Sequence, residues 1–277
     1  MSAPSAASPA ASAERARPVA LAGGPLRRLA DGTFAMALTE WRKLRHNQLD
    51  LLTRSVQPLL WLFVFGGAMS RLRSIPTGGI DYQAYLAPGV MAQAAMFVAI
   101  FFGLAVIWER DVGQLQRLLA TPLPRSAIVL GKSAGAATRA LVQATLLLVV
   151  VAIAGIGLRW SVHGVIGALV LLAIGTAAFA CLSMLIASMV KERERFMGIG
   201  QLVMMPLFFA SSALYPLAIM PGWLKVVAHV NPLTYEVEGL RGFLLGGGHP
   251  YLDILVCLGW LIVLATAATG AYPRALL

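Results

Sequence analysis

Residues 109–132 read ERDVGQLQRLLATPLPRSAIVLGK, and they follow an apolar run over residues 86–107, LAPGVMAQAAMFVAIFFGLAVI. A second apolar run begins at Ala134. Because about 20 consecutive apolar residues let a helix cross a bilayer core of roughly 30 Å, both flanking runs are predicted to span a membrane. The charged segment between them is then expected in water at one membrane surface. This alternation predicts a helical membrane protein.

Composition supports the same class for the whole chain. Hydrophobic residues make up 58% of the sequence, charged residues 12%, and the mean hydropathy is +0.77. Soluble domains carry about 25% charged residues. The apolar runs are continuous, which favours helices over barrel strands. We predict an all-α polytopic membrane protein with six transmembrane helices, at residues 51–69, 86–107, 134–158, 165–190, 196–214 and 252–270.

Basic residues decide the predicted orientation. An even number of spans places both termini on one side of the membrane, and most Lys and Arg residues then fall on that side. The positive-inside rule identifies it as the cytoplasm. The formal net charge of +10 is therefore explained by topology and by attraction to membrane lipid, and we expect no nucleic acid among the partners.

The amino-terminal region is predicted to contain a tail and a helix. Residues 1–25 are rich in Ala, Ser and Pro and lack the apolar stretch of a signal peptide, so we expect a disordered cytoplasmic tail at residues 1–30. From Asp31 onward, helical spacing predicts an amphipathic helix on the inner leaflet. Its apolar stripe contains Phe34, Leu38 and Trp41, with Arg42 and Lys43 off the stripe. A short helix that only marks the membrane surface fits the same pattern.

The sequence lacks the groups that catalysis or ion coupling requires. Cys181 and Cys257 fall inside apolar runs and the four histidines lack metal-ligand spacing, so we expect no metal site. No HExxH motif occurs, and we place all 12 acidic residues in tails, loops or the first residues of a span. Lys132 follows a glycine as in a phosphate-binding loop, but the glycine required five residues before Gly131 is Ser126. We therefore expect no catalytic residue in this chain.

The charged segment itself is predicted to start a short cytoplasmic helix. Glu109 and Asp111 favour a helix start, because a carboxylate is stabilised at a helix amino terminus. Pro122 ends the helix, because the residue before a proline avoids helical geometry. The apolar stripe between them consists of Val112, Leu115, Leu118 and Leu119. An ordinary loop lying on lipid is compatible with the same spacing.

The same segment resembles a family signature. The order Glu109-Arg110, Gly113, Leu118-Leu119, Thr121-Pro122-Leu123, Arg125 and Leu130-Gly131-Lys132 is similar to that of the ABC type-2 exporter permeases, and within them of the daunorubicin-resistance type of antibiotic and lipid exporter. Residues 85–90, YLAPGV, and 231–241, NPLTYEVEGLR, also resemble the family. The resemblance covers about residues 41–270 and assigns residues 31–277 to a single ABC type-2 transmembrane domain.

The resemblance implies a transport subunit that is not itself an enzyme. It implies two cytoplasmic ABC ATPase subunits that bind ATP and Mg, no cofactor in this chain, and a second permease copy, with a homodimer expected over a heterodimer. The implied cellular location is the bacterial cytoplasmic (inner) membrane, with both termini in the cytoplasm. The implied ATPase-coupling helix contains Glu109, Arg110, Gly113, Leu115, Leu118, Leu119, Thr121, Pro122 and Arg125. Residues 191–195 form either a second ATPase-facing loop or a solvated turn.

Residues 216–250 are too polar for a span but contain apolar faces. The resemblance implies two short re-entrant helices that cap the pathway at the outer leaflet, with a break at Asn231-Pro232. The residues assigned to this outer gate are Asn231, Pro232, Tyr235, Glu238 and Arg241. Because Glu238 and Arg241 are three residues apart, we expect a structural ion pair between them in preference to a substrate contact.

Polar and flexible residues inside the spans have two open interpretations. Gln57, Gln93, Gln143 and Gln201 either line a cavity or bond neighbouring helices. The candidate substrate-pathway residues are Met96, Phe97, Phe101, Met204, Met205 and Phe208, whose flexible apolar side chains suit either a lipophilic ligand or packing.

The resemblance implies export of a lipophilic drug, lipid or glycolipid from the cytoplasm or inner leaflet. Export of a polysaccharide by the same ABC mechanism is an alternative, as is a membrane scaffold. A third alternative is an ion-coupled secondary transporter. The expected lack of a buried acid argues against this alternative. The residues do not identify the cargo.

Overall fold

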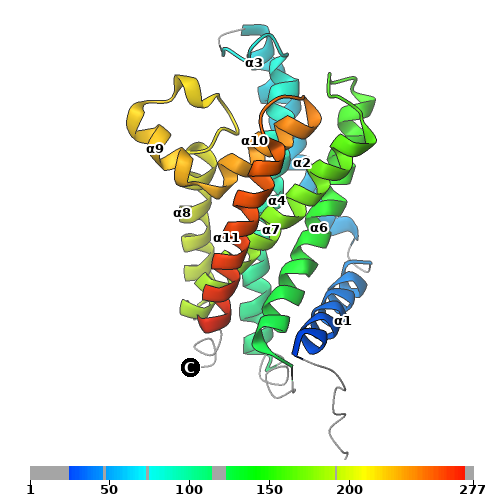
Figure 1. Cartoon of the computed structure of the whole chain (residues 1–277), viewed down its shortest axis with the longest axis vertical. Helices are drawn as coiled ribbons and strands as arrows, with labels where there is room; N and C mark the ends of the chain where they lie inside the picture. Colours follow the sequence, from blue (N-terminus) through cyan, green and yellow to red (C-terminus); the bar gives the residue numbers. More distant parts are fainter. Residues whose placement is uncertain (1–24, 46–47, 73–74, 114–122, 191, 272–277) are drawn as a thin grey trace, which may run out of the picture.

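The computed structural model describes residues 25–45, 48–72, 75–113, 123–190 and 192–271 (Figure 1). All regular structure within these ranges is helical, which confirms the predicted all-α class. The elements are α1 (Pro25–Arg45), α2 (Gln48–Leu60), a π-helical turn (Trp61–Phe65), α3 (Gly66–Leu72), α4 (Tyr82–Asp111), α6 (Arg125–Ile153), α7 (Val162–Met189), α8 (Arg193–Phe209), a 3-10 turn (Leu217–Ile219), α9 (Gly222–Val230), α10 (Pro232–Leu244) and α11 (Pro250–Ala271).

Four of the described helices, α4, α6, α7 and α11, are long and apolar enough to cross a membrane. They correspond to the predicted spans at residues 86–107, 134–158, 165–190 and 252–270. Helix α7 contacts the other three. The chain is therefore a multi-pass membrane protein.

The other two predicted spans do not form single long helices. Residues 48–72 are helical but are divided by the π-helical turn into α2 and α3. Helix α8 has 17 residues and ends at Phe209, five residues before the predicted end of its span. The spans predicted at residues 51–69 and 196–214 therefore stay predictions. A proline lies inside each of α2 and α8, where it limits regular helix formation.

Pro58 explains the π-helical turn that follows α2. Proline has no N–H, so the carbonyl oxygen of Arg54, four residues earlier, loses its helical donor. The side-chain amide of Gln143 on α6 donates to this oxygen instead, at 3.3 Å. The π-helical turn begins three residues after Pro58. Gln143 therefore bonds two helices, which is one of the two roles considered for it.

Glycines allow the helices to approach closely. A Cβ atom at Gly103 of α4 would lie 2.2 Å from Oγ of Ser183 on α7. One at Gly89 of α4 would lie 2.4 Å from the carbonyl oxygen of Ala213. Neither position has space for a side chain, and small residues at such crossings are typical of membrane helices.

Helix α1 begins at Pro25, six residues before the predicted start at Asp31. Proline suits the first turn of a helix, because the N–H that it lacks would have no helical acceptor there. The predicted disordered tail at residues 1–30 is therefore corrected at its carboxyl end, and residues 1–24 lie outside the described part.

Helix α1 packs against α6 (Figure 1). Glu40 is buried beside Gly135 and accepts a hydrogen bond from Nη2 of Arg139 at 2.9 Å. Phe34 and Leu38 are 72% and 39% exposed, as expected for side chains that face lipid. Arg42 is exposed, and the side chains of Trp41 and Lys43 lie outside the described part. The predicted amphipathic helix thus has a protein-facing side and an apolar exposed side.

Candidate functional site

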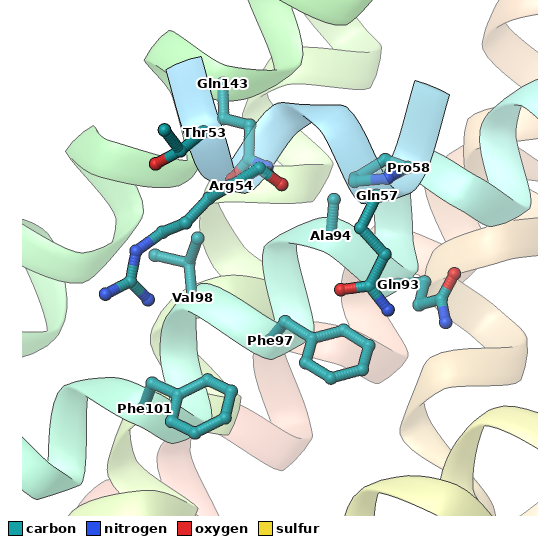
Figure 2. Close-up of a pocket in the computed structure, with 10 residues that line it drawn as sticks. All are labelled: Thr53, Arg54, Gln57, Pro58, Gln93, Ala94, Phe97, Val98, Phe101 and Gln143. Atoms are coloured by element: carbon teal, nitrogen blue, oxygen red, sulfur yellow. Dashed lines mark hydrogen bonds between the residues drawn. The ribbon is translucent and has the colours of Figure 1, made fainter. Parts of the chain in front are cut away.

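Three adjoining cavities follow one side of α4, and together we call them the α4 groove. The central cavity has a volume of about 120 Å³ and is shown in Figure 2. A second, of about 340 Å³, shares Arg54, Val98 and Phe101 with it and extends to Trp108 and Arg139. A third, of about 80 Å³, shares Gln57, Gln93 and Phe97 with it and extends to α8. The central cavity is lined by Thr53, Arg54, Gln57, Pro58, Gln93, Ala94, Phe97, Val98, Phe101 and Gln143.

The spacing of residues on α4 creates the groove's apolar side. Gln93, Phe97 and Phe101 are four residues apart and therefore lie on one helix face. The rings of Phe97 and Phe101 are stacked, with centroids 6.3 Å apart. Figure 2 shows the Gln57 amide of α2 reaching down toward Gln93 beside these rings. The groove therefore offers aromatic surface and amide groups side by side.

Five of the six predicted pathway residues line the groove. Phe97 and Phe101 lie in the centre, and the α8 end contains Met204, Met205 and Phe208. The placement of Met96 is corrected: its side chain is 0% exposed and lies in the hydrophobic core. Adjacent residues of a helix point about 100° apart, so Met96 faces away when Phe97 faces the groove.

The glutamines favour the cavity interpretation. Gln57, Gln93 and Gln201 all line the groove, and Gln143 lines it while also bonding α2. Arg54 and Arg139, which also line it, were not among the predicted site residues. Their signal was present in the sequence, because each is a charge at the edge of a predicted span.

Ion pairs join α4, α6 and α8 at the end of the molecule that is predicted to face the cytoplasm. Lys132 is 2% exposed and its Nζ contacts Oε2 of Glu109. Arg193 donates through Nε and Nη2 to Oδ2 of Asp111, at 3.1 and 2.9 Å. The Arg193 guanidinium also lies 4.3 Å from the ring centre of Trp108. These contacts fix three helix ends relative to one another, and we call them the inner-end pairs.

The predicted helix start at Glu109 is wrong. Helix α4 continues through Asp111, and Gly113 follows with φ of 72°, a left-handed conformation that glycine adopts readily at helix ends. Lys132 and Arg193 offset the unfavourable position of two carboxylates at a helix carboxyl terminus.

The rest of the predicted coupling segment is only partly described. Leu115, Leu118, Leu119, Thr121 and Pro122 lie outside the described residues. Arg125 is the first residue of α6 and is exposed. Arg110, in the last turn of α4, has its Nη1 3.5 Å from the carbonyl oxygen of Val190.

Asn231 forms the predicted break between two short helices at the opposite end, which is predicted to face outward. It ends α9 and caps α10, accepting a hydrogen bond from the Leu233 N–H at 3.0 Å. Its Nδ2 donates to the carbonyl oxygens of Leu207 and Ala210, at 2.6 and 3.0 Å. Carbonyls at the end of α8 lack helical donors, so Asn231 satisfies them. Pro232 occupies the first turn of α10, and the Tyr235 hydroxyl donates to the carbonyl oxygen of His229 at 2.7 Å.

Arg241 connects α10 to α4 and to the residues that follow α8. Its side chain forms the predicted pair with Oε1 of Glu238, at 3.0 Å, and its Cζ lies 3.6 Å from the ring centre of Tyr85. It also donates to the carbonyl oxygens of Tyr85, Ser212 and Ala213, at 3.2, 2.7 and 3.2 Å. These contacts agree with the structural role predicted for the pair.

Glu236 contradicts the expected lack of a buried acid. It is 0% exposed, and in the described part of the chain neither carboxyl oxygen has a hydrogen-bond partner. A Cβ atom at Gly175 of α7 would lie 2.4 Å from its carboxyl carbon. Burial raises the pKa of Glu236 well above its usual range. The polar residues around it in sequence do not indicate that α10 docks against α7.

Comparisons with known proteins agree with this architecture. Residues 32–245 match the family model of the ABC-2 type transporter. The chain is 30% identical over 246 residues to "Nodulation protein J" of Rhizobium leguminosarum bv. trifolii, covering 88% of this chain and 90% of that protein. It is 28% identical over 225 residues to "Putative transport permease ycf38" of Porphyra purpurea, covering 80% and 76%. The chain therefore belongs to the ABC-2 type transporter family and is a membrane transport subunit.

Proposed function

We propose that this chain is the permease of an ATP-driven exporter in a bacterial inner membrane. It moves a lipophilic drug, lipid or glycolipid from the cytoplasm or inner leaflet outward. Two separate ABC ATPase subunits bind ATP and Mg and dock at the inner end, on the segment between α4 and α6. A second copy of the chain completes the pathway.

The continuity of α4 is the observation that supports this proposal. One helix of 30 residues carries Glu109 and Asp111 at its inner end, the groove along its middle and the Arg241 contacts near its start. A force applied between α4 and α6 therefore reaches both the groove and the outer gate through a single helix. The inner-end pairs spread the same force to α6 and α8.

The lining of the groove supports an amphiphilic cargo. The stacked Phe97 and Phe101 rings offer surface to an apolar chain or ring system, and the glutamine amides offer hydrogen bonds to hydroxyl or amide groups. A drug, a lipid with a polar headgroup and a glycolipid all combine these features. A polysaccharide without a lipid would use only the amides.

Exposed apolar side chains beside the groove support pairing with a second copy. Val56 and Leu60 of α2 are 53% and 56% exposed, and Leu202 of α8 is 72% exposed. We assign residues 51–69 and 196–214, on this side, as the two remaining spans, which are the first and fifth along the chain. Six spans place both termini in the cytoplasm, in keeping with α1 and the end of α11 lying at the same end of the molecule (Figure 1).

Reconstitution with its ATPase tests the function. Proteoliposomes containing the chain and the ATPase are assayed with a panel of lipophilic drugs, lipids, glycolipids and polysaccharides. We expect ATP-dependent transport, stimulation of ATP hydrolysis by the cargo, and no effect of an ionophore that removes the proton gradient. Ion-coupled transport is the second candidate function, because Glu236 is a buried acid of the kind that such transporters use. Transport that continues without ATP and stops with the ionophore would establish that candidate instead.

A further inference from the structure

Glu236 is a buried acid that the proposed transport cycle does not use. Its carboxyl group is fully buried where α10 packs on α7, and both oxygens lack a hydrogen-bond partner among the described residues. The carboxyl occupies the space left by the missing side chain of Gly175, since a Cβ there would lie 2.5 Å from Oε2. The site is thus a closely fitted notch for one carboxyl group.

The helices around this notch provide no compensating charge. Helix α10 packs on α4, α7, α9 and α11. Apart from the three charged residues at the carboxyl end of α4, the other titratable groups on these helices are Tyr82, Tyr85, His163, Cys181, Lys225, His229, Tyr235, Glu238, Arg241, Tyr251, Asp253 and Cys257. None bonds Glu236: Arg241 is bonded to Glu238, His163 to Tyr251, and His229 to the carbonyl oxygen of Lys225. An ionised carboxylate without a partner is strongly unfavourable in such a place, whereas a neutral acid is much less so.

We propose that Glu236 is a proton-binding site whose occupancy controls the docking of α10 on α7. The neutral acid fits the notch, and the ionised acid favours the arrangement in which α10 moves away and water reaches the carboxyl group. The ligand is a single proton, taken up when the helices dock and released when they separate. This inference concerns the outer end of the chain and does not depend on the ATPase or on the cargo.

The direction of the pH dependence follows from linkage. Burial raises the pKa of Glu236 in the docked arrangement, whereas an undocked carboxyl keeps a pKa of about 4.3. Below that value both arrangements are protonated and docking is strongest. As the pH rises from there to the raised pKa, docking requires uptake of one proton, so its equilibrium constant falls about tenfold per pH unit. Above the raised pKa the dependence ends.

Infrared difference spectroscopy reads the protonation state directly. The full chain in lipid nanodiscs is compared with Glu236→Gln at pH 7. We expect the wild-type spectrum to contain the C=O stretching band of a protonated carboxylic acid that the variant lacks. Carboxylate bands in its place would overturn the proposal. Glu236→Ala provides the same comparison if the Gln variant does not fold. Glu194→Gln removes an exposed acid and is the matched control. Its difference from the wild-type spectrum should show carboxylate bands.

Amide hydrogen exchange tests the link to docking. Protection of the α10 amides, corrected for the intrinsic pH dependence of exchange, is measured between pH 5 and 8. In the wild-type chain we expect protection to fall with pH by up to about tenfold per unit, and in Glu236→Gln to be independent of pH. The same slope in both chains, or no slope in the wild type, would refute the link.

Discussion

The buried guanidinium of Arg241 shows how one side chain stabilises the outer end of the molecule. It is 7% exposed, yet it bonds Glu238 and three backbone carbonyl groups, one from α4 and two from the segment that follows α8. A buried charge is tolerated only when such bonds replace its water. Arg241 therefore fixes α10 to α4 and to the residues that follow α8.

Replacing Arg241 with Gln should destabilise the protein strongly. Three carbonyl oxygens lose a charged donor inside the fold, and we expect a loss of about 3 kcal/mol or more in the free energy of unfolding. Thermal unfolding of the purified chain measures this. The control is Arg195→Gln, because its pair with Glu192 is exposed and should contribute less than about 0.5 kcal/mol. Equal effects of the two changes would show that the Arg241 contacts do not stabilise the fold.

The predictability of individual contacts depends on the sequence separation of their partners. Glu238 and Arg241 were predicted to pair because residues three apart share a helix face. The pairing of Glu109 with Lys132 was not predicted, since it depends on where α4 ends and α6 begins. Burial of Glu236 depends on the docking of α10 against α7 at Gly175, 61 residues earlier in the sequence, which no local pattern encodes.

The break in α2 illustrates how one element compensates for another. Pro58 leaves the carbonyl oxygen of Arg54 without a helical donor, and Gln143 of α6 supplies the missing hydrogen bond. The cavity lined by these residues lies at this break. An irregular backbone near a groove is tolerated in a membrane protein when neighbouring side chains satisfy it.

A double-mutant cycle between Pro58 and Gln143 tests this compensation. Gln143→Met removes the donor, and we expect it to cost about 1 kcal/mol in the wild-type chain. Pro58→Ala restores a backbone N–H, so Gln143→Met should cost clearly less in that background. Thermal unfolding of the four proteins measures the coupling. Additive effects would mean that Gln143 does not replace the bond lost at Pro58.

The helical elements were predicted better than their ends. Long apolar runs correctly indicated α4, α6, α7 and α11, because hydrophobic length alone defines such helices. The end of α4 was misplaced, since Lys132 and Arg193 counteract the usual preference of carboxylates for a helix start. The start of α1 was also misplaced: it was predicted at Asp31, whereas the helix begins at Pro25.

At the scale of the whole molecule, α4 relates the inner end to the outer end. The inner-end pairs lie at its carboxyl terminus, the groove beside its middle and Arg241 beside its first turns. The sequence indicated the groove through Phe97, Phe101 and the glutamines. It did not indicate that Arg54 and Arg139 also line the groove. Transport therefore depends, in our proposal, on the rigid connection of α4 to the helices around it.

The inner-end pairs differ in how well they tolerate change. Glu109 meets a nearly fully buried Lys132, so a charge reversal at Glu109 disturbs folding as well as coupling. Asp111 and Arg193 are 38% and 40% exposed, so their exchange leaves the fold intact. The pair between Asp111 and Arg193 is therefore the better probe of how energy reaches the spans.

The rate of ATP-dependent transport by charge-swapped complexes tests the central claim most directly. Asp111→Arg and Arg193→Asp are made singly and together, and each chain is reconstituted with the ATPase. We expect each single change to slow transport about tenfold while ATP hydrolysis continues, and the double change to restore most of the rate. Arg195→Asp, an equal charge change at an exposed site on the same helix, should have little effect. Single variants that transport at the wild-type rate, or a double variant no better than either single one, would contradict the proposal.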